Sequence, residues 1–230
     1  MNIQDIRRNI RNAGVAGAVF DLGYRIANRS GRLMVLQMMK VTMESLDPEF
    51  LARGAPWERF QGSFLDEAAV RRHGIDPANE MAPRFLEEAL AKRDRCYALM
   101  DGDRLAAYGW YSTRETALGD GLTLSYGPQW VYMYKGFTHP AYRGLRLHAR
   151  GMAGALQATA SEGYRGLLSF VEANNFSSLR SVHRMGYRDI GRIVVLGILG
   201  RHWISVAPEC RPYGLELRCR RAECGDFPSS

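Results

Sequence analysis

Three arginines lie in and directly after a short turn in the second half of the chain, at spacings of three and four residues. The turn reads His139-Pro140-Ala141-Tyr142-Arg143-Gly144, and the helical pattern after it, residues 145–162, contains Arg146 and Arg150. The first turn of a helix has unpaired backbone N–H groups and a partial positive charge, so it binds anions such as a pyrophosphate. Arg143, Arg146 and Arg150 are predicted to share one face of this helix start. The pattern predicts a phosphate site, although a basic helix start alone is also typical of an ordinary surface turn.

Elements on both sides of this turn would position such a site. The apolar residues 129–138 predict a strand before it, and residues 166–173 predict a buried strand after the helix. Asn174-Asn175 then interrupts the pattern, residues 177–185 predict a second helix, and Gly186-Tyr187 ends it. In the first strand, alternation places Trp130, Tyr132 and Tyr134 on one face and Val131, Met133 and Lys135 on the other.

Taken together, residues 108–199 resemble the acetyl-CoA-binding core of the GCN5-related N-acetyltransferase (GNAT) superfamily. In that family the turn reads PxYRGxGxG, and an Asn precedes a GF or GY pair by eleven residues. Here residues 140–144 read Pro-Ala-Tyr-Arg-Gly, and Asn175 precedes Gly186 by eleven residues. Arg146 and His148 stand where the family has its later glycines, which predicts a remodelled loop if position 146 requires a positive φ. Arg146 is then either an extra phosphate clamp or a solvent-facing residue.

The resemblance implies acetyl-CoA, or another acyl-CoA, as the cofactor. Its pantetheine arm would run along the end of the first strand, and its diphosphate would bind at the turn and helix start. An Asn and the helix after the second strand would contact the arm. The implied cofactor-binding residues are Gly136, Phe137, Thr138, Arg143, Gly144, Leu145, Arg146, Leu147, His148, Asn175 and Ser178. An Asn that begins a helix is equally explained as an N-cap.

The resemblance also implies direct attack of an amine on the acetyl carbonyl, which needs a group to accept a proton. The candidate catalytic residues are Glu172, Tyr134 and His139. Each also has a structural interpretation: Glu172 as a solvated strand end, Tyr134 as a core residue, and His139 as an exposed loop residue. Val182 stands where family members often have a Tyr that protonates the thiolate.

The fold expected from this resemblance is α/β (α+β): a mixed, mostly antiparallel sheet flanked by helices, with an N-terminal helical extension. Residues 1–30 are predicted to be a basic amphipathic helical extension, residues 31–206 the acyltransferase domain, and residues 207–230 a polar basic tail that is loosely held from Cys210 on. Residues 32–42 predict the first strand and residues 79–92 a helix, and Asp101-Gly102-Asp103 predicts a hairpin turn. Residues 119–127 are expected to be a polar connection, and Trp57, Phe60, Phe64 and Phe85 either wall an acceptor pocket or fill the core.

The formal charge of +7 and pI of about 9.4 favour an anionic partner, which coenzyme A satisfies. We do not expect nucleic acid, because no motif of stacking aromatics accompanies the charge. The acceptor is expected to be a small-molecule or peptide amine. Residues 1–29 are expected to pack on the domain, on a second subunit as in a homodimer, or on a membrane surface. Four cysteines without zinc spacing predict no metal and a cytoplasmic protein, with peripheral membrane contact left open.

Overall fold

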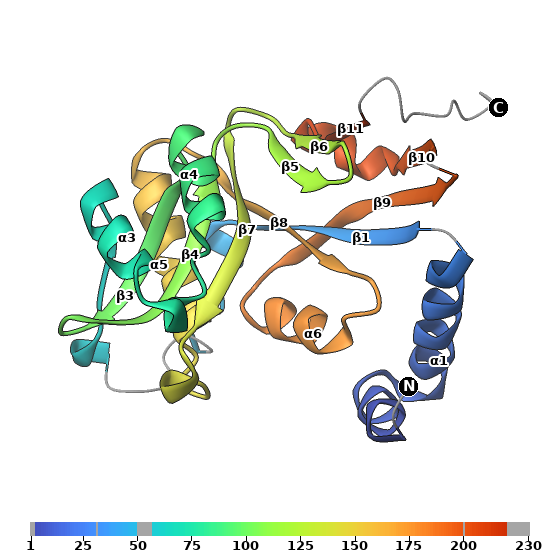
Figure 1. Ribbon diagram of the computed structural model, residues 1–230, viewed down its shortest axis with the longest axis horizontal. Helices are drawn as coiled ribbons and strands as arrows, with labels where there is room; N and C mark the ends of the chain where they lie inside the picture. The colour runs from blue at the N-terminus through green and yellow to red at the C-terminus, as the bar shows by residue number, and fades with distance from the viewer. Residues whose placement is uncertain (1–2, 31, 50–56, 200, 220–230) are drawn as a thin grey trace.

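A central sheet of eight strands organises the molecule (Figure 1). The computed structural model describes residues 3–30, 32–49, 57–199 and 201–219. In sheet order the strands are β10 (Arg201–Val206), β9 (Arg188–Ile198), β1 (Arg32–Val41), β8 (Gly166–Glu172), β7 (Trp130–Thr138), β4 (Arg104–Ser112), β3 (Arg95–Asp101) and β2 (Gln61–Phe64). Every neighbouring pair is antiparallel except β7 and β8, which are parallel. The predicted mixed, mostly antiparallel sheet is therefore confirmed.

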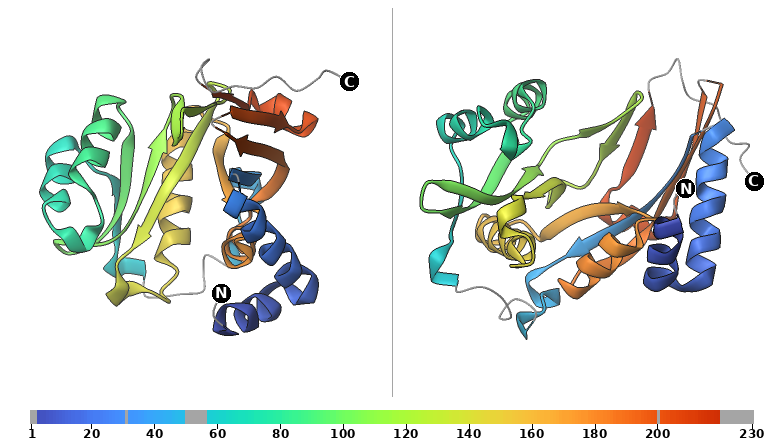
Figure 2. Two further views of the ribbon diagram at one scale, coloured as in Figure 1. Left: turned by 45° about the vertical axis from the view of Figure 1, so that its right-hand side comes forward. Right: turned by 60° about the horizontal axis from the view of Figure 1, so that its bottom comes forward.

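Helices and a second, smaller sheet cover the two faces of the central sheet (Figure 2). The helices are α1 (Ile3–Ser30), α3 (Glu67–Gly74), α4 (Pro83–Ala91), α5 (Leu147–Ser161) and α6 (Phe176–Arg184). Short 3-10 turns are η1 (Met43–Ser45), η2 (Trp57–Arg59), η3 (Pro77–Asn79), η4 (Pro140–Tyr142) and η5 (Pro208–Tyr213). The second sheet consists of β11 (Glu216–Cys219), β6 (Leu122–Ser125) and β5 (Thr116–Gly119).

Three apolar clusters show which element covers which part of the sheet. On one face, Leu147 and Met152 of α5 pack with Met133 and Leu167, and Val182 of α6 packs at the edge of the same cluster. On the other face, α4 packs against β3, β4 and β7 through a cluster that contains Leu86, Ala89, Trp110 and Phe137. The small sheet packs against β1, β8 and β9 through a cluster that contains Leu36, Leu124, Leu168, Ile193 and Leu217.

β1 lies in the interior of the sheet although it is the first strand of the chain. It pairs with β8 from Leu36 to Val41 and with β9 from Arg32 to Lys40. Its residues Met38 and Met39 are fully buried on opposite faces, in two different clusters. The N-terminal strand is therefore an integral part of the core, and α1 is attached directly to it.

Two predictions about connecting segments are wrong. Residues 119–127, expected to be a polar connection, contain the end of β5 and all of β6, and Leu122 and Leu124 are buried. In the predicted tail, expected to be loosely held from Cys210 on, residues 208–213 form η5 and residues 216–219 form β11, with Cys210, Leu215 and Leu217 buried. The apolar residues of both segments are few, but together they cover the face of β1, β8 and β9 that carries no helix. The rest of the predicted tail lies outside the described residues.

Candidate active site

β7 and β8 begin as neighbours and then diverge. In the described part of the chain their pairing is confined to Trp130–Gly166, Val131–Leu167 and Tyr132–Leu168. Beyond that point β7 continues to pair with β4 as far as Thr138, and β8 with β1 as far as Glu172. The hydroxyl of Ser169 donates a hydrogen bond across the divergence to the carbonyl oxygen of Met133, at 3.0 Å. The edge of β7 that leads to Gly136 and Thr138 is thus left without a neighbouring strand.

The turn between β7 and α5 contains two residues in the left-handed region. Gly144 has φ of 87°, and Arg146, the N-cap of α5, has φ of 60°. The helix begins at Leu147 and not at Leu145, so Arg143 and Arg146 precede it and do not share a helical face with Arg150. Positive φ is disfavoured for a residue with a Cβ, so Arg146 occupies a strained position of the kind that favours glycine.

The start of α5 has the features of an anion site. Its first intrahelical hydrogen bond is from the Arg150 N–H to the Arg146 carbonyl oxygen, so the N–H groups of residues 147–149 have no acceptor within the helix. The side chains of Arg143 and Arg146 are exposed next to them. Arg150 is half-buried and instead lines a cavity of about 710 Å³ with Phe60 and Tyr97. Of the three arginines, two are placed to meet an anion at the helix start.

A carboxylate that the sequence did not single out anchors this turn. Tyr142 donates a hydrogen bond to Asp101 Oδ2 at 2.8 Å, and Arg59 Nε donates to Asp101 Oδ1 at 2.9 Å. The hydrogen bonds from Arg59 and Tyr142 lower the pKa of Asp101 to about 2. The bond to Asp101 also raises the pKa of Tyr142. Asp101 lies in the predicted hairpin turn, where an aspartate is already explained, so no sequence signal pointed to this second role.

His148, the second residue of α5, packs over Gly136 of β7. Burial lowers the pKa of the imidazole, so it is neutral at physiological pH. Leu145 and Leu147 pack into the apolar cluster beneath α5. The backbone of Gly136 remains exposed, whereas Phe137 is buried against Tyr108, with ring centroids 5.3 Å apart.

A β-bulge changes the alternation predicted for β7. The register with β4 shifts between Trp110 and Tyr111, which pair with Lys135 and Met133. Tyr134 is the extra residue of the bulge, and Lys135 therefore lies on the same side of the sheet as Tyr134. On that side, Lys135 Nζ lies 4.1 Å from the centroid of the Phe85 ring. The prediction that Lys135 shares a face with Val131 and Met133 is therefore wrong.

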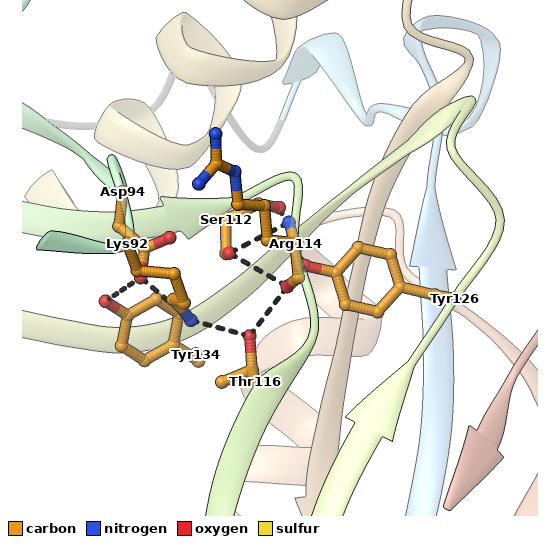
Figure 3. A network of polar contacts seen from close by, with 7 residues as sticks. All are labelled: Lys92, Asp94, Ser112, Arg114, Thr116, Tyr126 and Tyr134. Carbon is orange, nitrogen blue, oxygen red and sulfur yellow. Dashed lines mark hydrogen bonds and ion pairs between the residues drawn. The ribbon is translucent and has the colours of Figure 1, made fainter. Parts of the chain in front are cut away.

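Tyr134 belongs to a polar network between β7, α4 and β5 (Figure 3). Its hydroxyl donates to Asp94 Oδ2 at 2.8 Å, and the same oxygen lies 2.9 Å from Lys92 Nζ. Lys92 in turn donates to Thr116 Oγ1 at 2.9 Å. Burial, followed by the neighbouring charge of Asp94, raises the pKa of Tyr134. Tyr134 is therefore held as a neutral hydrogen-bond donor at physiological pH.

The other two predicted catalytic residues lie in different surroundings. Glu172 is exposed at the end of β8 and lines a cavity of about 360 Å³ with Tyr24, Arg25 and Asn174. The Nδ1 atom of His139 accepts a hydrogen bond from the Ala141 N–H at 3.3 Å, which leaves Nε2 to carry the proton of the neutral ring. His139 borders a cavity of about 310 Å³ lined also by His73 and Asp103. The structure does not bring Glu172, Tyr134 and His139 into one cluster.

At the start of α6, Asn175 acts as the N-cap. Its Oδ1 accepts hydrogen bonds from the Ser178 N–H at 3.2 Å and from the Ser177 hydroxyl at 3.1 Å. Gly186, eleven residues on, has φ of 98°, and a Cβ there would overlap the carbonyl oxygen of Ser45. The sequence spacing of Asn175 and Gly186 therefore reflects one cap and one tight contact at the two ends of a short helix.

The aromatic residues predicted as pocket walls have separate roles. Phe60 lines the cavity of about 710 Å³ beside α5. Phe64 packs edge-on against Tyr97, with centroids 5.1 Å apart, and Phe85 packs edge-on against Trp110 at 5.2 Å. The side chain of Trp57 lies outside the described residues. Within the described residues, no group of three or more His, Cys, Asp or Glu side chains is arranged to hold a metal ion.

Comparisons with known proteins agree with this architecture. Solved structures similar to the chain include a GNAT-family protein from Novosphingobium aromaticivorans DSM 12444, with 20% identity over 73% of this chain and 66% of that one, and a TM-score of 0.49. A GCN5-related N-acetyltransferase from Sphaerobacter thermophilus has 16% identity over 84% of this chain and 57% of that one, with a TM-score of 0.49. A glucosamine N-acetyltransferase region of a fungal multi-domain β-N-acetylglucosaminidase has 14% identity over 80% of this chain and 23% of that one, with a TM-score of 0.51.

The chain thus spans less than two thirds of the length of each of these proteins. At 14% identity, the likeness to the fungal region shows the fold alone. No curated protein sequence matches the chain significantly. The sequence model of the Acetyltransferase (GNAT) family, however, matches residues 58–187, which include the turn after β7, α5, β8 and α6. This match covers more than half of the 230 residues, so the chain belongs to the GNAT acetyltransferase family, whose members generally transfer acetyl from acetyl-CoA.

Proposed function

We propose that this protein transfers the acetyl group of acetyl-CoA to a primary amine by direct attack. The observation that carries the proposal is the divergence of β7 and β8 beside the start of α5. An unpaired strand edge and a helix N-terminus then lie next to each other. The first suits the amide groups of a pantetheine arm and the second suits a diphosphate.

In this proposal the diphosphate binds to the N–H groups of residues 147–149, with the exposed Arg143 and Arg146 beside it. The pantetheine arm pairs with the free edge of β7 at Gly136, Phe137 and Thr138, as an added strand would. Asn175 and Ser178, at the start of α6, face the arm from the side of β8. Gly144 and Leu145 form the turn that precedes the helix. Leu147 and His148 pack between the start of α5 and β7, beneath the proposed diphosphate site.

The chemistry needs a polarised carbonyl and a proton acceptor. A backbone N–H near Phe137 or Thr138 stabilises the developing oxyanion. The amine nitrogen forms a bond to the acetyl carbon, the carbon–sulfur bond breaks, and the amine proton passes to a base. Glu172 is our first candidate for that base, acting directly or through water, with Tyr134 and His139 as the other two. Because Val182 cannot donate a proton, the thiolate leaves as the anion or takes its proton from water.

The acceptor is a primary amine on a small molecule, a sugar, an amino acid or a protein N-terminus. We place the protein in the cytoplasm, which is consistent with the free, buried thiols of Cys96 and Cys210. Acetyl is the proposed acyl group, and the titration with a long-chain acyl-CoA tests whether the site prefers a longer one.

The test is calorimetric titration of the protein with acetyl-CoA, desulfo-CoA and a long-chain acyl-CoA at two salt concentrations, followed by measurement of thiol release with a panel of amines. Micromolar binding that prefers acetyl-CoA, with amine-dependent thiol release, supports the proposal. Tighter binding of the long-chain acyl-CoA would instead indicate that the protein transfers a longer acyl group. Tight binding without release for any amine would indicate a binding protein that has lost catalysis, and no binding at all would contradict the cofactor site.

A further inference from the structure

Helix α1 is attached to the domain through a polar face. Asp21 Oδ1 accepts a hydrogen bond from Asn174 Nδ2 at 3.1 Å, and the Tyr24 hydroxyl accepts one from the Val35 N–H at 3.2 Å. Asn28 pairs with both backbone groups of Leu33, each at 3.0 Å. Asp21 is 2% exposed and Tyr24 is 7% exposed. Directional bonds to two segments, β1 and the residues after β8, therefore fix which side of the helix faces the protein.

The apolar side of the same helix faces solvent. Val15, Val19, Leu22 and Ile26 recur every three or four residues and are 69%, 64%, 42% and 56% exposed. Val19 lies two residues from Asp21, and Ile26 two residues from Tyr24, so each pair is about 200° apart around the helix. We call these four side chains the outer stripe of α1. It lies opposite the hydrogen-bonded face.

This arrangement is the reverse of an ordinary surface helix, whose apolar stripe is turned toward the core. If the helix rotated to bury the outer stripe, the bonds of Asp21, Tyr24 and Asn28 would break. Contiguous exposed apolar residues on an ordered element mark a docking surface. The hydrogen bonds therefore keep the outer stripe exposed to solvent.

More exposed apolar side chains lie at the end of the sheet next to α1. Leu196 and Ile198 of β9 are 37% and 39% exposed, and Leu199 is 98% exposed. Leu196 pairs with Leu33, the residue that Asn28 of α1 holds. Figure 2 shows the end of α1 beside the end of β9 in both views. These exposed side chains of β9 therefore lie close to the end of α1 that carries Asn28.

We propose that the outer stripe of α1 docks this protein on an anionic lipid surface. The segment 3–30 has five arginines and two aspartates, and the whole chain has a formal charge of +7. The net positive charge of this segment and of the whole chain disfavours pairing with a second copy, whereas anionic lipid headgroups attract it. A basic helix with an exposed apolar stripe is the form that lies in the interface of such a membrane. Within the described residues, no helix is long and apolar enough to cross one.

The side of α1 that faces the protein contacts the start of α6. Asn174 bonds to Asp21, and Phe176 packs edge-on against Phe20 with centroids 6.3 Å apart, so α1 contacts both neighbours of Asn175. The lipid proposal does not depend on the proposed catalytic activity, since binding to vesicles is measured without substrate.

The test uses the full chain and co-sedimentation with vesicles of phosphatidylcholine alone or mixed with phosphatidylserine. We expect binding only to the mixed vesicles, weakened by high salt. Val19→Asp should weaken partitioning into the vesicles about tenfold or more. It removes an apolar side chain that the lipid would bury, and it adds a negative charge that the anionic headgroups repel. Ile75→Asp is the matched control: Ile75 is 80% exposed, lies at the end of α3, and should leave binding unchanged.

Circular dichroism melting of each variant checks the fold, and Val15→Ser with Val19→Ser replaces Val19→Asp if the latter melts early. Equal sedimentation of wild type and the stripe variant would overturn the proposal. Equal binding to both kinds of vesicle would overturn the role of anionic lipid. A dimer in analytical ultracentrifugation that Val19→Asp dissociates, without vesicle binding, would identify a second copy as the occupant and also overturn it.

Discussion

His148 lies directly against the Cα atom of Gly136, so that a Cβ built on Gly136 would come within 2.8 Å of His148 Nδ1. Real Cβ atoms do not approach other atoms so closely, and the same Cβ would also lie 3.0 Å from Met133 Cε. The glycine and the histidine therefore fit each other. His148 stands at a position where the family resemblance predicts a glycine, and Gly136 supplies the missing space from the facing strand.

Gly136→Ala should destabilise the fold by about 1–3 kcal/mol through overpacking and should weaken binding of acetyl-CoA, because the edge of β7 must shift. His148→Ala in the same chain should restore most of the stability, since it removes the atoms that a Cβ meets. Urea unfolding of the two single variants and the double variant measures the coupling between the sites. Additive losses would show that the two residues are not in contact.

Arg146 gives a second prediction, from its backbone. At φ of 60° an alanine has the same left-handed strain as arginine, whereas glycine has little. Arg146→Gly should therefore be more stable than Arg146→Ala by about 1 kcal/mol, although both lose the same charge. Thermal unfolding compares them. If alanine were the more stable of the two, residue 146 would be an ordinary helical residue and not a left-handed cap.

Arg143→Glu should raise the dissociation constant for acetyl-CoA about tenfold or more, because it places a negative charge beside the diphosphate. The effect should shrink at high salt. Arg114→Glu, in the connection between β4 and β5, is the control with the same change of charge. Calorimetry that shows equal losses for the two variants would indicate a general effect of net charge and not a local phosphate site.

Asp101 predicts how stability depends on pH. Its pKa is lowered to about 2 in the folded chain, against about 3.9 when unfolded, so its stabilising contribution is complete above roughly pH 4 and is lost as the pH falls toward 2. Asp101→Asn should lower the free energy of unfolding at pH 7 and flatten its acid dependence between roughly pH 4 and 2. Urea unfolding at several pH values measures both. Asp103→Asn, an exposed neighbour in the same hairpin, should have little effect.

Glu172→Gln should slow acetyl transfer about a hundredfold while leaving the affinity for acetyl-CoA nearly unchanged, if Glu172 accepts the amine proton. Tyr134→Phe is the comparison, because it removes the bond to Asp94 without touching Glu172. Turnover and its pH profile at saturating amine decide the assignment. If Glu172→Gln kept wild-type turnover while Tyr134→Phe or His139→Gln lost it, the residue whose substitution lowers turnover would be assigned as the base.

Local patterns predicted the part of the fold that surrounds the cofactor site. The strand before the turn, the helix after it, the second strand and the short helix all lie within two residues of the predicted bounds. Periodicity and turn residues are sufficient there, because each element depends on its neighbours in the chain. The hairpin at Asp101-Gly102-Asp103 followed from the same kind of signal.

Pairings between distant segments were decided only by the tertiary structure. The position of β1 between β8 and β9 joins Met38 to residues more than a hundred positions away, and no local pattern encodes that choice. The bulge at Tyr134, the bond from Tyr142 to Asp101 and the left-handed cap at Arg146 depend in the same way on what each segment packs against. The sequence alone determined that α1 is an amphipathic helix. Its orientation, with the polar face inward and the apolar stripe outward, was decided by Asn174, Val35 and Leu33, because hydrogen bonds to these residues exist only once the sheet has formed.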